Sequence, residues 1–206
     1  MHPQRLSIKL FATQPIARAE LHPFIGVFHR FIQESAVPGL LIDVADYAHV
    51  PDGPGVILIG HEVDYGIDLA GGRTGLLTTR KRAGDAGLPD GLRSPAARCA
   101  QLAELFRDTL GKALVEARAI EADDTVSVRF ASVALEIACP DRLASPITAS
   151  AFEWACKELK PIAASVFGAA AWFENAGGSD PRRLLTLRLS GDGADLAARI
   201  ARLEKR

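Results

Sequence analysis

The chain has 206 residues, of which 48% are hydrophobic and 24% are charged, and its 24 basic and 25 acidic side chains leave a net charge of −1. This composition is typical of globular proteins and supplies enough apolar material for a buried core, which argues against an intrinsically disordered chain. A protein without excess positive charge gains little from displacing the counterions of a nucleic acid, so we expect no nucleic-acid partner.

The first 80 residues predict a strand, a helix and then a group of strands. Residues 6–10 alternate between apolar and polar side chains, which is typical of a strand with one buried face. Apolar residues at helical spacing predict a helix over 21–32. After a short strand near 40–44, we expect a hairpin whose first strand is one long segment, 55–69, and whose second strand is 76–80.

A glycine-rich loop is expected at 83–93, followed by a long helix that ends near Arg118. Within residues 125–138 the phase of the apolar residues reverses at Ala131, which indicates a bulge or a tight turn between two strands.

The last third of the chain predicts a helix, two strands and a short helix. The spacing of Ser150 and Glu153 is that of a capping box, so the helix is expected to begin there. Pro161 is expected to kink or restart it. Strands are expected near Trp172 and over 185–189, and a short helix closes the chain.

This order of elements and its short connections favour an α+β fold: a mixed, mainly antiparallel sheet, or two sheets, with helices packed on one side. We expect a single domain over 1–206. The two halves of the element order resemble βαββα units that meet near 119–125, which is a weak indication of an internal repeat. The pattern leaves open whether the halves share one sheet.

The chain shows no targeting or membrane-spanning segment that we can recognise. Its N-terminal apolar run is short and is broken by Lys9, unlike a secretory signal peptide. No apolar run approaches the roughly 20 residues that span a bilayer, so no membrane association is expected. The three cysteines lack the paired spacing of a zinc or disulfide motif. The sequence therefore predicts a cytoplasmic protein with reduced cysteines.

The segment DYAHVPDGPGVILIGHEVDYGID, residues 46–68, holds the candidate catalytic residues Asp46, His49, Asp52 and His61. A histidine beside a carboxylate can act as a general base. If 55–69 is one strand, however, its side chains alternate between two faces. His61 then lies in the core on the apolar face, and Glu62 lies on the other. His49 is then best interpreted as an exposed turn residue.

In the same strand arrangement, Glu62 is expected to form a cross-strand salt bridge with Lys81. Two further features suggest ligand binding. The turn around Gly53 and Gly55 could hold an anion with its backbone amides, and Arg80 and Arg82 at a strand end could hold a phosphate or a carboxylate. Basic strand ends also occur without any ligand, because they discourage edge-to-edge aggregation.

The segments IDVADYAHVPDGPGVILIGHEVDYGIDLAGGRTGLL and CPDRLASP resemble parts of a family of uncharacterised bacterial cytosolic proteins. The resemblance covers most of the chain in several short motifs. It implies no activity, cofactor or partner.

Two functional hypotheses follow. The first is a module that binds a small, anionic molecule or a protein partner through residues 49–55 and the basic strand end. The second is an enzyme of the hydrolase type, with a histidine and aspartate site in residues 46–62, with or without a divalent metal. A homo-oligomer without a small ligand is a third alternative. The sequence assigns no cofactor and predicts no specific metal site.

Overall fold

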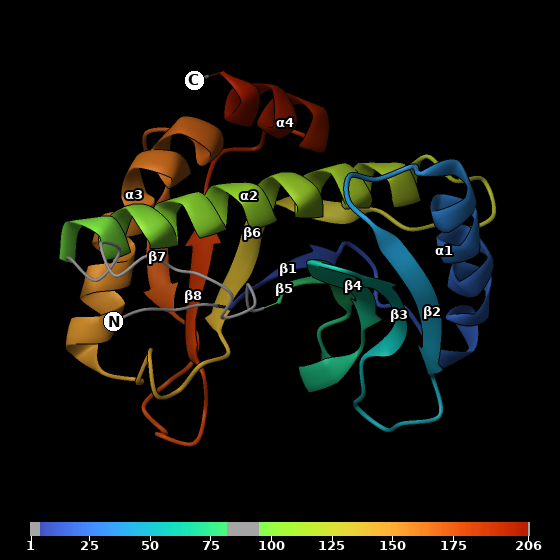
Figure 1. The fold of residues 1–206 in the computed structure, drawn as a ribbon, viewed down its shortest axis with the longest axis horizontal. Coiled ribbons are helices and arrows are strands. Elements are labelled where there is room, and N and C mark those ends of the chain that lie inside the picture. The colour runs from blue at the N-terminus through green and yellow to red at the C-terminus, as the bar shows by residue number, and fades with distance from the viewer. Residues whose placement is uncertain (1–4, 82–94, 206) are drawn as a thin grey trace.

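Eight strands form one antiparallel sheet in the computed structural model, which describes residues 5–81 and 95–205 (Figure 1). The strands, in the order of the chain, are β1 (Leu6–Ala12), β2 (Leu41–Tyr47), β3 (Gly55–Gly60), β4 (Val63–Asp68), β5 (Gly75–Arg80), β6 (Phe130–Cys139), β7 (Trp172–Asn175) and β8 (Leu185–Ser190). Across the sheet their order is β2-β3-β4-β5-β1-β6-β8-β7. The predicted α+β class is confirmed, and the two halves of the chain share this sheet.

Four α-helices accompany the strands in the described residues: α1 (His22–Glu34), α2 (Pro95–Glu121), α3 (Ala149–Phe167) and α4 (Leu196–Glu204). With 27 residues, α2 is about 40 Å long at the usual helical rise, and it crosses the middle of the sheet (Figure 1). The helix α1 packs on β2 and β3, whereas α3 packs on β7 and β8 and α4 rests on α2 and α3. None of these helices combines the length and hydrophobicity that crossing a bilayer requires.

The face of the sheet under the helices is built from two cross-strand rows. One row runs through Val56, Ile67, Leu76, Leu10, Leu135 and Leu189, and the other runs through Leu58, Tyr65, Thr78, Ile8, Ile137 and Leu187. All twelve side chains are at most 1% exposed. The period-two pattern of the strands thus produces a continuous core, in which Tyr65 and Thr78 are the polar members.

The opposite face carries a row of alternating charge. Lys9, Glu136, Arg188 and Glu174 are neighbours in register on β1, β6, β8 and β7. Arg188 contacts both acids, with 2.7 Å to Glu136 and 2.9 Å to Glu174. Lys9 instead bonds to Asp68 at 2.5 Å, and both of these side chains are about nine-tenths buried. The charges in this row are therefore paired with opposite charges on the same face.

The prediction of one long strand over 55–69 is wrong, because the chain turns back at His61 and Glu62 and forms two strands, β3 and β4. Gly60 permits the turn, since a Cβ atom there would lie 2.3 Å from the carbonyl oxygen of Val63. The core residues of β3 are even-numbered, Val56 and Leu58, whereas those of β4 are odd-numbered. Ile57 and Ile59 lie on the opposite face of the sheet. Their odd numbers match those of the core residues of β4 only by coincidence, and this match suggested one continuous strand.

The structure decides between the alternatives for residues 125–138 and for Pro161, and it corrects the predicted cap of α3. Residues 130–139 form one strand. The reversed phase of its apolar residues comes from a register shift in its pairing with β1, so the bulge alternative is confirmed and the turn alternative is wrong. The N-cap of α3 is Thr148, whose side chain accepts a hydrogen bond from the Ala151 amide at 3.2 Å, and not Ser150. The same helix continues through Pro161 without a restart.

Only the second half of the chain has the predicted βαββα order of elements, so the two halves are not a repeat of one another. That half reads β6-α3-β7-β8-α4, whereas the first half has four strands between α1 and α2. In each half the first strand pairs with the last, β1 with β5 and β6 with β8. The single-domain assignment stays a prediction.

Candidate functional site

The four predicted catalytic residues lie at opposite ends of β3. His49 and Asp52 lie in the turn between β2 and β3, with Asp46 just before it, and His61 lies in the turn after β3. A strand of six residues is roughly 17 Å long, so His61 cannot share a reacting atom with these aspartates. His61 is exposed, and its interpretation as a core histidine is therefore wrong. His49 is exposed in its turn.

Several residues of the turn between β2 and β3 have a structural role in that turn. The Asp46 carboxylate accepts a hydrogen bond from the Ala48 amide at 2.8 Å, and Asp52 adopts a left-handed backbone conformation with φ of 49°. The Gly53 amide donates to the Val50 carbonyl at 3.2 Å. Gly55 has φ of 66°, and a Cβ atom there would lie 2.2 Å from the Ile67 carbonyl oxygen. Turn geometry explains both glycines without an anion.

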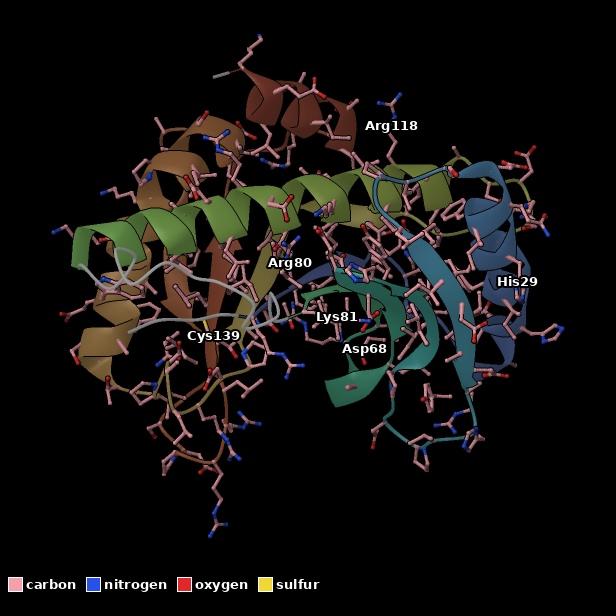
Figure 2. All side chains as sticks on the ribbon, viewed as in Figure 1. His29, Asp68, Arg80, Lys81, Arg118 and Cys139 are labelled. Carbon is pink, nitrogen blue, oxygen red and sulfur yellow. The ribbon has the colours of Figure 1, made fainter. Side chains whose placement is uncertain are left out.

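The basic strand end is neutralised by nearby carboxylates. Figure 2 labels Arg80 and Lys81, the two basic residues. Arg80 bonds to Glu62 at 2.8 Å and to Asp108 on α2 at 2.9 Å, whereas Lys81 bonds to Asp64 at 2.8 Å. The partner of Glu62 is thus Arg80, not Lys81 as predicted. The Arg80 guanidinium, helped by Lys112, lowers the pKa of Glu62. Arg82 lies outside the described residues. The described cations at this strand end are therefore committed to internal ion pairs.

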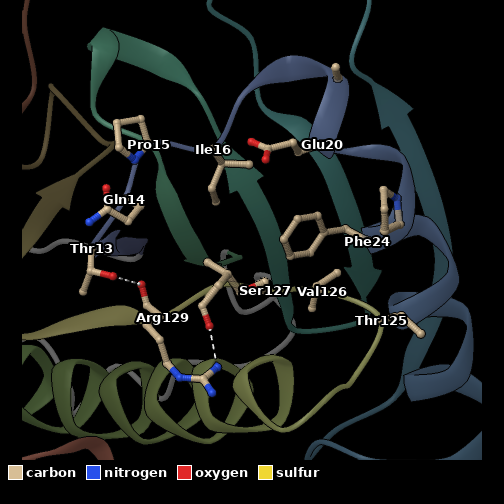
Figure 3. A pocket seen from close by; sticks show the side chains of 13 residues that line it. Thr13, Gln14, Pro15, Ile16, Glu20, Phe24, Thr125, Val126, Ser127 and Arg129 are labelled. Carbon is tan, nitrogen blue, oxygen red and sulfur yellow. Dashed lines mark hydrogen bonds between the residues drawn. The ribbon is translucent and has the colours of Figure 1, made fainter.

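A larger candidate site is a cavity of about 520 Å³ at another place in the fold. It lies between the connection from β1 to α1 and the connection from α2 to β6, two segments that are about a hundred residues apart in the sequence (Figure 3). Its lining consists of Thr13, Gln14, Pro15, Ile16, Ala19, Glu20, Pro23, Phe24, Thr125, Val126, Ser127, Val128 and Arg129. Ile16, Phe24 and Val128 are buried, so this lining is mainly apolar at its base.

Hydrogen bonds fasten the two walls of this cavity at both ends. At one end, the Arg129 carbonyl accepts from the Thr13 amide at 2.8 Å and from the Thr13 hydroxyl at 3.2 Å. At the other end, Arg30 of α1 bonds to Asp123 at 2.5 Å and to the Thr125 hydroxyl at 2.9 Å. Hydrogen bonding to Arg30 and Thr125 lowers the pKa of Asp123 although partial burial opposes it. The hydrogen bonds at both ends therefore hold the two walls of the cavity in fixed positions.

The charged residues of the cavity lie at its rim. The Glu20 carboxylate accepts a hydrogen bond from the Ala17 amide at 2.7 Å. The Arg129 guanidinium lies over α2 and donates from Nη1 to the Val128 carbonyl at 2.8 Å (Figure 3). The same Nη1 donates to the Glu121 carbonyl at the end of α2 at 3.0 Å. One acid and one base thus flank an apolar interior, which leaves the site without a strong preference for charge.

A second unusual feature lies beneath α2. Glu116 is fully buried, as is Thr78, and Tyr65 is 1% exposed. In the described part of the chain, no hydrogen-bond partner is found for either carboxylate oxygen of Glu116 or for the two hydroxyl groups. Burial raises the pKa of Glu116 to about 8. It also raises the pKa of Tyr65, and the negative charges of Glu116 and Asp108 act in the same direction.

The sequence analysis missed both the cavity and the buried cluster. Nothing in residues 13–16 or 125–129 signals a site, because the two segments meet only after β1 and β6 have paired. Glu116 directly precedes Ala117 of the apolar stripe, about 100° away on the helix, so its burial was within reach of a helical-phase argument. Across residues 5–81 and 95–205, no group of three or more metal-ligating side chains is found.

Comparison with known proteins adds no relative. No family model matches the sequence, and no similar curated protein is found.

Proposed function

We propose that the protein is a binding module for a small, mainly apolar organic molecule, which occupies the cavity between residues 13–24 and 125–129. The observation that carries this proposal is the cavity itself, with about 520 Å³ and a buried apolar base. Cavities that bind small molecules usually measure about 300–1,000 Å³ and combine apolar walls with a few polar groups. The hydroxyl and amide groups of Thr13, Gln14 and Ser127 would supply such polar contacts.

This proposal keeps the binding class that the sequence favoured and changes the place and the ligand. The turn around Gly53 and the pair Arg80 and Lys81 lose support as an anion site, since their amide and charged groups already have partners. The hydrolase alternative loses its His61 form, because the length of β3 separates His61 from Asp46 and Asp52, and its His49 form stays a prediction. A cytosolic location, a protein partner and the family resemblance stay predictions.

The proposal is tested with anilinonaphthalene sulfonate, a dye whose fluorescence rises on entering an apolar site. The wild-type protein is expected to bind the dye saturably. Val126→Trp places a large side chain in the cavity and is expected to weaken binding by about tenfold or more, which corresponds to about 1.4 kcal/mol.

The matched control is Leu143→Trp, which adds the same indole ring at a residue that is 99% exposed and lies outside the cavity lining. This variant is expected to bind the dye like the wild type. Circular dichroism checks that both variants are folded. Equal dye affinity in a folded Val126→Trp variant and in the wild type would contradict the proposed site.

A further inference from the structure

We propose that the interface between α2 and strands β4 and β5 encloses a water-binding site, formed by the carboxyl group of Glu116 and the hydroxyl groups of Tyr65 and Thr78. This site is separate from the proposed ligand cavity, and none of its three residues lines that cavity. It does not depend on the proposed function.

The positions of the three side chains bring them to one interface. Tyr65 and Thr78 are direct partners in the pairing of β4 with β5, and both are on the face covered by the helices. The helix α2 packs on these two strands as well as on β1. Lys112, one helical turn before Glu116 on α2, lines a small cavity together with Tyr65, so this side of the helix faces Tyr65.

Four buried oxygen atoms without a partner would be costly if the interface were dry. Buried polar groups in folded proteins are nearly always hydrogen-bonded, and the exceptions often mark a water or an ion that has not been located. A protonated carboxyl group and two hydroxyl groups offer both donors and acceptors. A water molecule, with two donors and two acceptors, matches this set better than a metal ion does.

A small cavity also lies next to Tyr65, one of the three residues of the cluster. This cavity of about 10 Å³ is lined by Tyr65 together with Lys112, Glu62 and residues 38–41. That volume is close to the minimum of roughly 10–15 Å³ that one water needs. Lys112 is one helical turn before Glu116 on α2, so the cavity lies beside the cluster.

Among the residues that the structure describes, the charged side chains near the cluster are bonded to groups other than Glu116. Arg80 on β5 and Lys112 on α2 are both bonded to Glu62 and Asp108. The strand β1 contributes apolar side chains to this layer, and the buried residues of α3 are all apolar. On α4, the side chains of Arg199 and Arg202 bond to Asp192 and to the Val166 carbonyl. A neutral carboxyl group bonded to water is consistent with these surroundings.

The substitution Thr78→Val tests the water site, because the proposal and a dry interface predict changes of opposite sign in the melting temperature. Valine has nearly the shape of threonine, so the variant removes the hydroxyl group without opening a cavity. If that hydroxyl bonds to an internal water, the substitution loses a hydrogen bond, and we expect the melting temperature to fall by about 2–4 °C. If the interface is dry, removing an unpartnered polar group raises the melting temperature, and an increase or no change overturns the proposal.

The matched control is Thr79→Val, one residue along β5 on the opposite face, where the hydroxyl bonds to the Ser7 hydroxyl. Because this hydroxyl has a partner, Thr79→Val gives the fall in melting temperature that one lost hydrogen bond causes on this strand, and we expect a fall of similar size for Thr78→Val. A high-resolution crystal structure of the full chain supplies an independent readout. We expect ordered water within hydrogen-bond distance of Glu116 and at least one of the two hydroxyl groups, and a direct bond from Glu116 to Tyr65 with no water would overturn the proposal.

Discussion

Substituting Glu116 by glutamine is expected to change how stability depends on pH. The folded protein holds the pKa of this carboxyl at about 8 by burial, against an ordinary value of 4.5 in the unfolded chain. The folded state therefore keeps a proton that the unfolded state releases, and wild-type stability falls as the pH rises from about 4.5 to about 8. One retained proton corresponds to a slope of about 1.4 kcal/mol per pH unit. The total loss is on the order of 5 kcal/mol.

Glutamine stays neutral at every pH, so Glu116→Gln lacks this slope. We expect the variant and the wild type to have similar free energies of unfolding near pH 5, and the variant to be more stable by several kcal/mol near pH 8. Urea unfolding at about one-unit pH intervals measures the difference. Glu104→Gln, an exposed position on the same helix, is the control for the charge change and is expected to follow the wild type. Parallel pH profiles for Glu116→Gln and the wild type would refute this reasoning.

Three other substitutions test the fold around the sites. Asp68→Ala leaves the ammonium group of Lys9 buried without its carboxylate partner, so we expect the free energy of urea unfolding to fall by about 3–5 kcal/mol. Replacing Lys9 by Met and Asp68 by Leu together should restore most of this loss. Asp195→Ala removes the N-cap bond to the Ala198 amide in α4 and should cost about 1 kcal/mol in thermal unfolding, so no loss would argue against the cap. His61→Ala should change stability by less than about 0.5 kcal/mol, and a loss of several kcal/mol would restore the core interpretation.

Local periodicity predicted most of the elements because burial follows side-chain alternation directly. Residues 6–10 formed a strand and residues 22–34 a helix, as their spacing indicated. The turn at His61 escaped the same reasoning because β3 is apolar on both faces, so that its odd-numbered residues Ile57 and Ile59 seemed to continue into the odd-numbered core residues of β4. Alternation gives the face of a residue only relative to its neighbours in the same strand. A turn without a clear sequence signal therefore changes which residue numbers face the core, and the sequence does not reveal the change.

The candidate site was much harder to predict than the fold. The cavity walls, residues 13–24 and 125–129, come together through the pairing of β1 with β6, which no local pattern in either segment encodes. The segment with the most catalytic side-chain types, residues 46–68, forms strands β3 and β4 and the turns before and after β3. Several of its carboxylates bond to nearby backbone, as Asp46 does, or to neighbouring charges, as Glu62 does. Residue type alone could not separate these structural uses from a catalytic use.

The most direct test of small-molecule binding is to map the binding site residue by residue. Amide spectra of the isotope-labelled full chain are recorded by nuclear magnetic resonance during titration with anilinonaphthalene sulfonate. We predict saturable shifts at the amides of the cavity residues, including Ile16, Phe24 and Val128, with the turns at His49 and His61 unchanged. Saturable shifts centred on either turn, or no saturable shift at the cavity residues, would contradict the proposed function.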